Sequence, residues 1–196
     1  MCSIILYLYS IYRYVYMNRL QLQQTLKDWD KKEGRYVFRK HELVKLFPDD
    51  NAKAFSEAIS RHVRDGLIIR ACYGVYVNSD AVSFDRFTIE HIAIALRAGH
   101  YNYISLESIL SEYGAISQIP IDRLTIMTTG RSGAYQTPYG VIEFTHTQRS
   151  IEDILTNTSK IKERPLRVAT KRTAWRDLKR VGRNIHLVDL SEIEND

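Results

Sequence analysis

PDDNAKAFSEAISRHVRDGLIIRACYGVYVN, residues 48–78, carries the clearest structural pattern in this chain. Four apolar side chains recur in it at the three-to-four spacing of one helix face, namely Phe55, Ala58, Ile59 and Val63. Asp49 or Asp50 is placed to cap this helix at its N-terminus, and Gly66 stands where a C-cap adopts the left-handed conformation. The stretch therefore predicts a helix with one apolar stripe and otherwise polar faces.

Two short β-rich runs follow this helix, at residues 67–70 and 75–78. Tyr73 and Gly74 lie between them, as in a tight β-hairpin. A polar-faced helix that leads through glycine into a short hairpin is the way in which a winged helix-turn-helix ends. We therefore expect this stretch to be the DNA-contacting part of the chain.

The residues before this stretch complete the pattern of a small domain. A helix is predicted over 18–29, a short extended segment at 36–38, and a second helix over 40–46 that Pro48 ends. Helix, strand, helix, helix and hairpin within about sixty residues is the element order of a winged helix-turn-helix. We predict such a domain at residues 17–79.

The second half of the chain, residues 80–196, shows both helical and strand periodicity. The predicted helices cover 87–98, 103–113 and 170–181, with a short apolar turn or helix at 151–155. The predicted strands or extended segments cover 124–129, 141–147 and 164–168, and 130–140 is expected to be a long turn-rich connection. The predicted class is therefore α+β, with an N-terminal winged helix-turn-helix followed by a mixed α+β domain.

Residues 1–16 form an apolar leader that holds five of the thirteen tyrosines. The run is too short to cross a bilayer, and Arg13 interrupts it. It also lacks the basic start and small-residue cleavage site of a secretory signal. Because a well-patterned helix follows Met17 at once, we expect Met17 to be the working start and the leader to be untranslated. A loosely packed appendage is the alternative, and no membrane association is expected.

The basic charge of the chain is concentrated in two regions. Net charge is +5, with 12 basic and 8 acidic residues in 18–79 and 13 basic and 6 acidic residues in 121–183. The segment between them, 80–120, has 2 basic and 5 acidic residues. This distribution favours a polyanion bound at two places, although a solvated basic surface would explain the same charges.

No catalytic or metal-binding motif stands out in the sequence. Cys2 and Cys72 have no metal or redox spacing, and the six histidines have no ligand spacing. The nucleophile elbow, the Asp-x-Asp pair and the dinucleotide fingerprint are absent. We therefore expect no enzyme activity, no cofactor and no metal, and a reducing cytoplasm as the location.

Several ordered segments carry a family resemblance. They are ISRHVRDGLIIR at 59–70, YISLESILSEYG at 103–114, LTIMTTGRSG at 124–133, TPYGVIEFTH at 137–146, and LRVAT at 166–170, which leads to Arg176-Asp177-Leu178. In this order the chain resembles the AbiEi family, the antitoxin member of AbiE-type (type IV) bacterial toxin–antitoxin and abortive-infection pairs. One motif departs from the family, because Lys171 and Arg172 stand where relatives often have Pro and Glu.

The resemblance implies a protein of two parts. The winged helix would bind inverted repeats upstream of its own operon and repress it. The C-terminal domain would carry the antitoxin activity and assist operator binding. The cognate toxin of such pairs looks like a nucleotidyltransferase encoded downstream, and its neutralisation is described as not needing a stable complex.

The candidate DNA contacts lie on the predicted recognition helix, on the wing and at the start of the preceding helix. They are Arg39, Lys40, Asn51, Lys53, Ser56, Ser60, Arg61, Arg64, Arg70 and Tyr73. Lys53 is expected to contact guanine or phosphate, whereas Arg61 and Arg64 lie where phosphate is the natural partner. Glu57 is expected to point sideways. An ordinary solvated face, or a module that docks a protein, would show the same pattern.

A second basic set lies in the C-terminal half. Arg172, Arg176, Lys179 and Arg183 are spaced four, three and four apart, which predicts one stripe on a helix. Arg131 is a further exposed candidate, in a Gly-Arg-Ser-Gly loop that is not a P-loop because a strand follows it. Nucleic-acid phosphate is the preferred partner. A solubilising face and an acidic partner protein are the alternatives. For the whole chain, the alternatives to an antitoxin are a plain winged-helix regulator and an interaction protein that binds an acidic partner.

Overall fold

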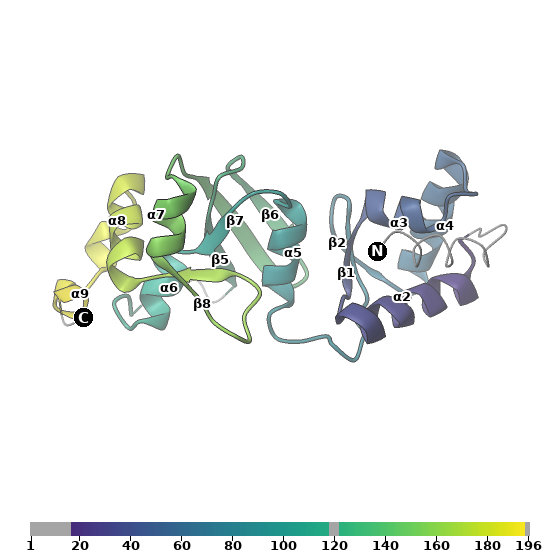
Figure 1. Ribbon diagram of the computed structural model, residues 1–196, viewed down its shortest axis with the longest axis horizontal. Coiled ribbons are helices and arrows are strands. Elements are labelled where there is room, and N and C mark those ends of the chain that lie inside the picture. Colours follow the sequence, from purple (N-terminus) through teal and green to yellow (C-terminus); the bar gives the residue numbers. More distant parts are fainter. Residues whose placement is uncertain (1–16, 118–121, 195–196) are drawn as a thin grey trace. The chain divides into compact units, whose positions relative to one another are not determined.

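The computed structural model describes residues 17–117 and 122–194. Within these residues the chain forms eight α-helices, one short 3₁₀ helix and two β-sheets (Figure 1). The predicted α+β class is therefore confirmed, while the leader at 1–16 lies outside the described residues. The chain divides into two compact units between Asp85 and Arg86.

The first unit has the element order that the sequence predicts. Its elements are α2 Arg19–Glu33, β1 Val37–Arg39, α3 Lys40–Leu46, α4 Ala52–Arg64, β2 Ile69–Cys72 and β3 Val75–Val77. Asn18 and Gln21 form a capping box at the start of α2, and Gly34 ends the helix in the left-handed conformation. The strands form one antiparallel sheet in the order β1-β3-β2, so β1 adds a third strand to the hairpin.

The apolar stripe of α4 forms the centre of the core of this unit. Phe55, Ala58 and Ile59 are buried, and Val63 packs against the same cluster from a partly buried position. The stripe meets apolar side chains from α2, α3 and the sheet, which are Leu22, Leu26, Phe38, Leu43, Phe47, Leu67, Ile68 and Tyr76. Each fully buried side chain of this size contributes about 1.5 to 3 kcal/mol to folding, so the stripe holds α4 on the unit.

The expected N-cap of α4 is wrong by one or two positions. Asn51, not Asp49 or Asp50, caps the helix, because its Oδ1 accepts hydrogen bonds from the backbone N–H groups of Lys53 at 3.1 Å and Ala54 at 2.9 Å. Asp50 instead accepts a hydrogen bond from the backbone N–H of Met17 at 2.9 Å. Asn51 directly precedes the first helical residue, where a short side chain reaches the free N–H groups.

The second unit is built on a six-stranded mixed sheet in the order β6-β7-β5-β4-β9-β8. The strands are β4 Asn102–Ile104, β5 Arg123–Thr128, β6 Gly133–Thr137, β7 Gly140–His146, β8 Thr158–Lys160 and β9 Arg167–Ala169. The pairs β5–β7 and β4–β9 are parallel, and the other pairs are antiparallel. Buried residues such as Ile126, Ile142 and Phe144 form its apolar interior.

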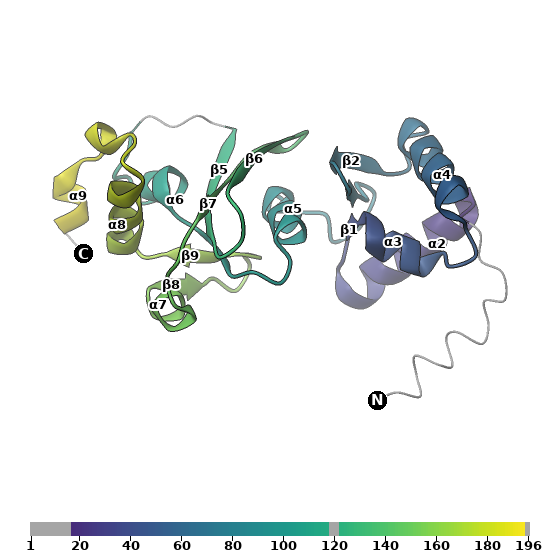
Figure 2. The same cartoon turned by 90° about the horizontal axis from the view of Figure 1, so that it is seen from above.

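Helices cover both faces of this sheet. They are α5 Thr88–Leu96, α6 Leu106–Glu112, α7 Ile151–Thr156 and α8 Lys171–Val181, followed by η1 Ile185–Leu187 and α9 Leu190–Glu194. Figure 2 shows α5 on one side of the sheet and α6 and α8 on the other. A hydrogen bond from the Thr125 backbone to Ser108 Oγ, at 2.8 Å, joins β5 to α6.

Four short elements of the second unit differ from the prediction or are missing from it. Residues 130–140, expected as a connection, contain β6, which pairs with β7 through a turn at Pro138 and Tyr139. The helix expected at 103–113 begins only at Leu106, because the preceding residues form β4. Two further elements, β8 and α9, carry no clear periodicity, since three to five residues are too few to show one.

A buried carboxylate links three parts of the second unit. Asp177 of α8 is fully buried and accepts hydrogen bonds from Tyr103 Oη at 3.0 Å and Ser105 Oγ at 2.9 Å. Arg149 donates to it through Nε at 3.1 Å and Nη2 at 2.8 Å. Burial, and next the Asp177 carboxylate, raise the pKa of Tyr103, so its hydroxyl stays protonated and donates. This network ties α8 to β4 and to the segment after β7.

Replacing Asp177 by Asn is expected to destabilise the second unit by about 3 kcal/mol, because Arg149 would lose its buried counter-charge and keep only the more exposed Asp153. Trp175 is the one tryptophan of this unit, so urea unfolding of the full chain in a Trp29→Phe background reports on it alone. Glu163→Gln, at an exposed position, is the control and should leave the transition unchanged. An unchanged transition in Asp177→Asn would mean that the network contributes nothing to stability.

Candidate nucleic-acid interface

The polar side of α4 is exposed along its whole length. Lys53, Ser60, Arg61 and Arg64 are exposed and Ser56 is half-buried, while the apolar stripe faces the core. Neither Lys53 nor Arg61 has a carboxylate within 4 Å among the described residues, and Arg64 lies at 3.9 Å from exposed Asp65. The helix therefore presents cations that the described parts of the protein do not neutralise.

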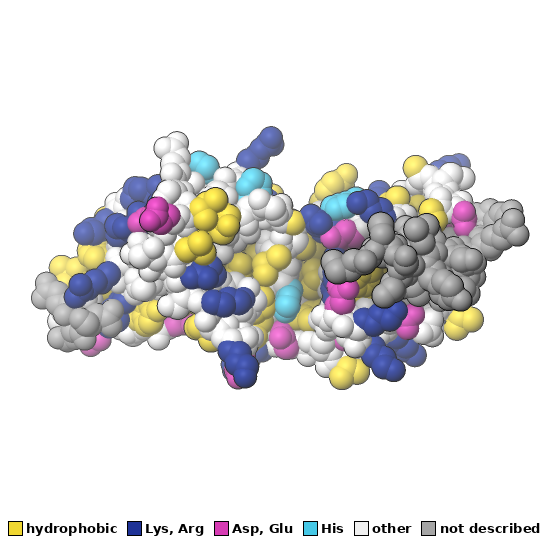
Figure 3. Space-filling view, in the orientation of Figure 1, with side chains coloured by type: hydrophobic (Ala, Val, Ile, Leu, Met, Phe, Trp, Pro, Cys, Tyr) yellow, Lys and Arg dark blue, Asp and Glu magenta, His cyan; other side chains and the backbone are white. Residues whose placement is uncertain are grey.

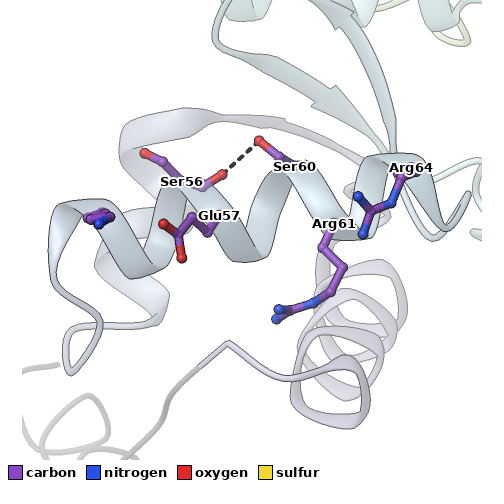
Figure 4. A pocket seen from close by; sticks show the side chains of 6 residues that line it. Ser56, Glu57, Ser60, Arg61 and Arg64 are labelled. Atoms are coloured by element: carbon purple, nitrogen blue, oxygen red, sulfur yellow. Dashed lines mark hydrogen bonds between the residues drawn. The ribbon is translucent and has the colours of Figure 1, made fainter.

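A shallow hollow of about 530 Å³ follows this side of the helix, lined by Lys53, Ser56, Glu57, Ser60, Arg61 and Arg64. Figure 4 shows Ser56 and Ser60 along one edge of the helix and Glu57 and Arg61 along another. Glu57 was expected to point sideways. It is exposed and lines the same hollow, so its negative charge lies on the same face as the cations. The face carries three cations and one carboxylate, and it is basic in balance.

The two serines are held by their own helix. Ser56 Oγ donates to the Ala52 carbonyl at 2.8 Å, and Ser60 Oγ donates to the Ser56 carbonyl at 2.7 Å. Lys40 Nζ of α3 lies at 3.4 Å from Ser56 Oγ, which brings the start of α3 to the same face. Each hydroxyl hydrogen is used in a hydrogen bond to a backbone carbonyl, so the serine oxygens can only accept hydrogen bonds from an external partner.

Two other predicted contacts are engaged within the unit. Arg39 forms a salt bridge to Glu42 at 2.7 Å, and Arg35 pairs with the same carboxylate. Burial raises the pKa of Glu42, but hydrogen bonds from Arg39 and Arg35 outweigh it and lower this pKa to about 2. Arg39 is thus held as part of the α3 N-terminus. Asn51 uses its side-chain oxygen to cap α4, which leaves only its amide N–H groups for a partner.

The β2–β3 turn presents an aromatic and a cation together. Tyr73 is 86% exposed, and the guanidinium of Arg70 lies over its ring at 5.7 Å from the centroid. Gly74 takes the left-handed conformation that the turn requires. Its carbonyl accepts a hydrogen bond from the backbone N–H of Lys40 at 2.7 Å, so this turn is joined to the start of α3.

The predicted stripe of four cations on the C-terminal helix does not form. Helix α8 ends at Val181, Gly182 caps it in the left-handed conformation, and Arg183 leaves the helix direction. Arg183 pairs with Glu107 at 2.8 Å and also with Glu143. Although burial opposes the change, hydrogen bonds from Arg183 and Arg123 lower the pKa of Glu143. Arg183 is therefore a structural cation that holds the end of α8 to α6 and β7.

The other members of the second basic set have different environments. Arg176 is half-exposed and pairs with Asp153 of α7 at 3.2 Å. Lys179 is exposed and lies over the ring of Trp175 at 5.2 Å from the centroid, while Arg172 and Arg131 are exposed. Figure 3 shows Lys and Arg side chains over α8, with acidic side chains beside them over α7. The sequence spacing could not show that acidic residues from α6, α7 and β7 would meet these cations.

His62 of α4 is a residue that its sequence position did not mark as part of a site. It is buried on the core side, and its ring nitrogens make no hydrogen bond of normal geometry to the described residues. Burial lowers the pKa of His62 and the nearby cations Arg61 and Arg19 act in the same direction, while the Met17 backbone and Asp65 oppose the shift. A neutral imidazole is therefore packed beneath the polar face.

No group of acidic, histidine or cysteine side chains that could hold a metal ion occurs in the described part of the chain. No helix within residues 17–117 and 122–194 is long and apolar enough to span a membrane. Cys72 is a half-buried free thiol whose pKa burial raises, which makes it a weak nucleophile.

Comparison with known proteins shows the fold alone. No family model matches the sequence, and no curated protein matches it. The structure is similar to the crystal structure of the RV2827C protein from Mycobacterium tuberculosis, with a TM-score of 0.53 and 12% sequence identity. The similarity covers 83% of this chain and 61% of that chain, so this chain spans less than two thirds of the other protein.

The burial of His62 predicts a pH dependence of folding. Its folded-state pKa lies below the ordinary value of 6.5, so stability should be full above pH 6.5 and fall as the pH drops through 6.5 towards the folded pKa. His62→Leu should make the melting temperature depend less on pH between 7.5 and 5.5. His41→Gln, at an exposed position, is the matched control. An equal pH dependence in His62→Leu and the native chain would contradict this.

Proposed function

We propose that residues 17–79 form a winged helix-turn-helix that binds double-stranded DNA through α4. The observation that carries the proposal is the division of α4 into a buried apolar stripe and an exposed face. On that face Lys53 and Arg61 have no ion-pair partner among the described residues. Unpaired cations on an exposed helix, next to a short hairpin, suit the phosphates and base edges of a duplex.

The contacts of such a domain can be assigned from the positions of the side chains. The N-terminal half of α4 would enter the major groove, with Lys53 towards a base edge or phosphate. Arg61 and Arg64, further along the helix, would contact phosphates, and Lys40 would hold the backbone at the start of α3. In the turn, Tyr73 and Arg70 would reach phosphates or the minor groove.

We further propose that the chain is an autoregulatory antitoxin of an AbiE-type pair. The family resemblance of residues 103–178 supports this proposal. In it, the first unit represses the operon by binding inverted repeats, and the second unit carries the antitoxin activity. The partner is a nucleotidyltransferase-type toxin that acts in the same cytoplasm and forms no stable complex with this chain. No enzyme activity, metal or cofactor is assigned to the chain.

The proposed DNA contact predicts that the double variant Lys53→Ala, Arg61→Ala loses operator binding. A gel shift with DNA from directly upstream of the gene should show affinity reduced by about 100-fold or more, because two charge-assisted contacts are removed. Circular dichroism should be unchanged, since both side chains are exposed. The matched control removes two other exposed cations, Lys31→Ala with Lys32→Ala at the end of α2, and should bind normally.

Retained binding by the Lys53, Arg61 variant would remove α4 as the recognition helix. If the native chain does not bind upstream DNA in the gel shift but binds an acidic protein, the chain is an interaction module. Such a result would contradict the repressor proposal.

The salt dependence of binding tests the assignment of phosphate contacts. If about six phosphates are neutralised, the logarithm of affinity should fall with a slope of about −5 against the logarithm of salt concentration. Arg61→Ala should make this slope shallower by about 1, because one phosphate contact is lost. Lys162→Ala, in an exposed part of the second unit, should keep the native slope. An unchanged slope in Arg61→Ala would mean that Arg61 touches no phosphate.

A further inference from the structure

The loop between β5 and β6 contains Gly130-Arg131-Ser132-Gly133, here called the glycine loop. Its backbone is held by two basic residues from outside it. The Nε of Arg97 donates to the Arg131 carbonyl at 2.9 Å, and His146 Nδ1 lies at 2.8 Å from the Gly130 carbonyl. The backbone N–H of His146 also donates to Ser132 Oγ at 2.8 Å. The loop is therefore fixed in place by contacts with Arg97 and His146.

Arg97 is a buried cation without a counter-charge among the described residues. It is 9% exposed, and its Nη1 donates to the Leu96 carbonyl at 3.1 Å and to Tyr135 Oη at 3.0 Å. Its guanidinium lies over the rings of Tyr135 and Phe144, at 5.1 and 4.4 Å from their centroids. No described carboxylate lies within 4 Å of it, and the groups that contact it directly are carbonyls, a hydroxyl and aromatic rings. A buried cation that lacks a counter-charge is stabilised when an anion from outside the protein binds to it.

The second terminal nitrogen of Arg97 is free to bind such an anion. Nη2 has no hydrogen-bond partner among the described residues and lies against Gly133, where an added Cβ would come within 3.5 Å of it. At Gly130 an added Cβ would approach Arg97 Cδ and the ring of His100 to 3.1 Å. A Cβ at Gly133 would meet Nη2 at ordinary contact distance, so glycine leaves that nitrogen uncovered on this side, whereas Gly130 packs closely against Arg97 and His100 and lets the loop approach them.

Further donors surround the same loop. Arg131 is exposed, and its side chain contacts none of the described residues by hydrogen bond or ion pair. His100 and His146 are exposed, and Ser132 Oγ, which accepts a hydrogen bond from the His146 backbone N–H, donates to none of the described residues. Arg180 of α8 donates to the His146 carbonyl at 3.2 Å and adds positive charge nearby. Several hydrogen-bond donors thus lie on or next to the loop, and a phosphate group offers three strong acceptor oxygens to them.

We propose that the glycine loop, with Arg97, Arg131 and His100 around it, binds a phosphate group. The site lies in the second unit, and this proposal does not depend on DNA binding by α4. Its chemistry fits the terminal phosphate of a small nucleotide or a backbone phosphate of nucleic acid. It differs from a P-loop, because side chains rather than the N-terminus of a helix supply the positive charge.

The test is a titration of the full-length chain with inorganic phosphate, followed by NMR of the arginine Nε–H signals. The Nε–H signal of Arg97 should shift in a saturable way, and sodium chloride at matched ionic strength should not shift it. Arg131→Ala should weaken phosphate binding about tenfold, because one charge-assisted contact is lost. Its exposed side chain makes this variant safe for folding. Lys162→Ala, another exposed cation, is the matched control and should bind phosphate as the native chain does.

Arg97→Lys tests whether binding needs the guanidinium group or only a positive charge, since lysine keeps the charge but lacks the free Nη2 group. It should also weaken phosphate binding, with Trp175 fluorescence confirming that the second unit is folded. No saturable shift in the native chain, or equal affinity in Arg131→Ala, would overturn the proposal. The variant Lys53→Ala, Arg61→Ala should bind phosphate normally, so a failure of the DNA proposal leaves this result unaffected.

Competition identifies the source of the phosphate. If adenosine monophosphate displaces inorganic phosphate and a short DNA duplex does not, the site takes a small nucleotide. If the duplex displaces phosphate even with Lys53 and Arg61 replaced, the site takes a nucleic-acid backbone. If neither displaces phosphate from the Arg97 signal, the proposed site is wrong.

Discussion

The packing of the apolar stripe of α4 against the core of the first unit is the constraint that decides which side chains of this helix are exposed. Phe55 and Ile59 are almost fully buried and meet side chains from α2, α3 and the sheet. This contact fixes the rotation of the helix about its axis. Once the rotation is fixed, Lys53 and Arg61 must lie on the exposed side, and they have no compensating carboxylate among the described residues. The proposed DNA contact follows from this packing, because burial of one face determines what the other face can bind.

In the second unit, unlike on the exposed face of α4, several arginines form ion pairs with buried carboxylates. Asp177, Glu90 and Glu107 are buried or nearly buried, and each is paired with an arginine that comes from a distant part of the sequence. Glu90 of α5 pairs with Arg164 at 2.6 Å and also accepts from the Leu166 backbone at 3.2 Å. Arg149, Arg164 and Arg183 therefore hold strands and helices of this unit together, and this part of the basic excess in residues 121–183 is neutralised within the unit. Arg97 differs from these arginines, since only neutral groups contact it.

Much of the first unit could be predicted from sequence because its signals are local. The spacing of Phe55, Ile59 and Val63 predicted the buried face of α4, and Gly66 and Gly74 marked the helix end and the turn. The second unit was harder, since β4, β8 and β9 have three residues each and gain their stability from pairing with distant strands. Residue spacing likewise predicted that Arg183 continues a helical stripe. It could not show the left-handed Gly182, or the carboxylates of Glu107 and Glu143 that hold Arg183 instead.

The most direct test of the central claim is a ¹H–¹⁵N NMR titration of the full chain with DNA from upstream of its own gene. We expect the amide signals of α4 and of the β2–β3 turn to shift most. Signals from the buried stripe should keep their slow hydrogen exchange, because the core does not open. Shifts confined to the second unit, or absent throughout at saturating DNA, would contradict the claim that the exposed face of α4 is the surface that binds DNA.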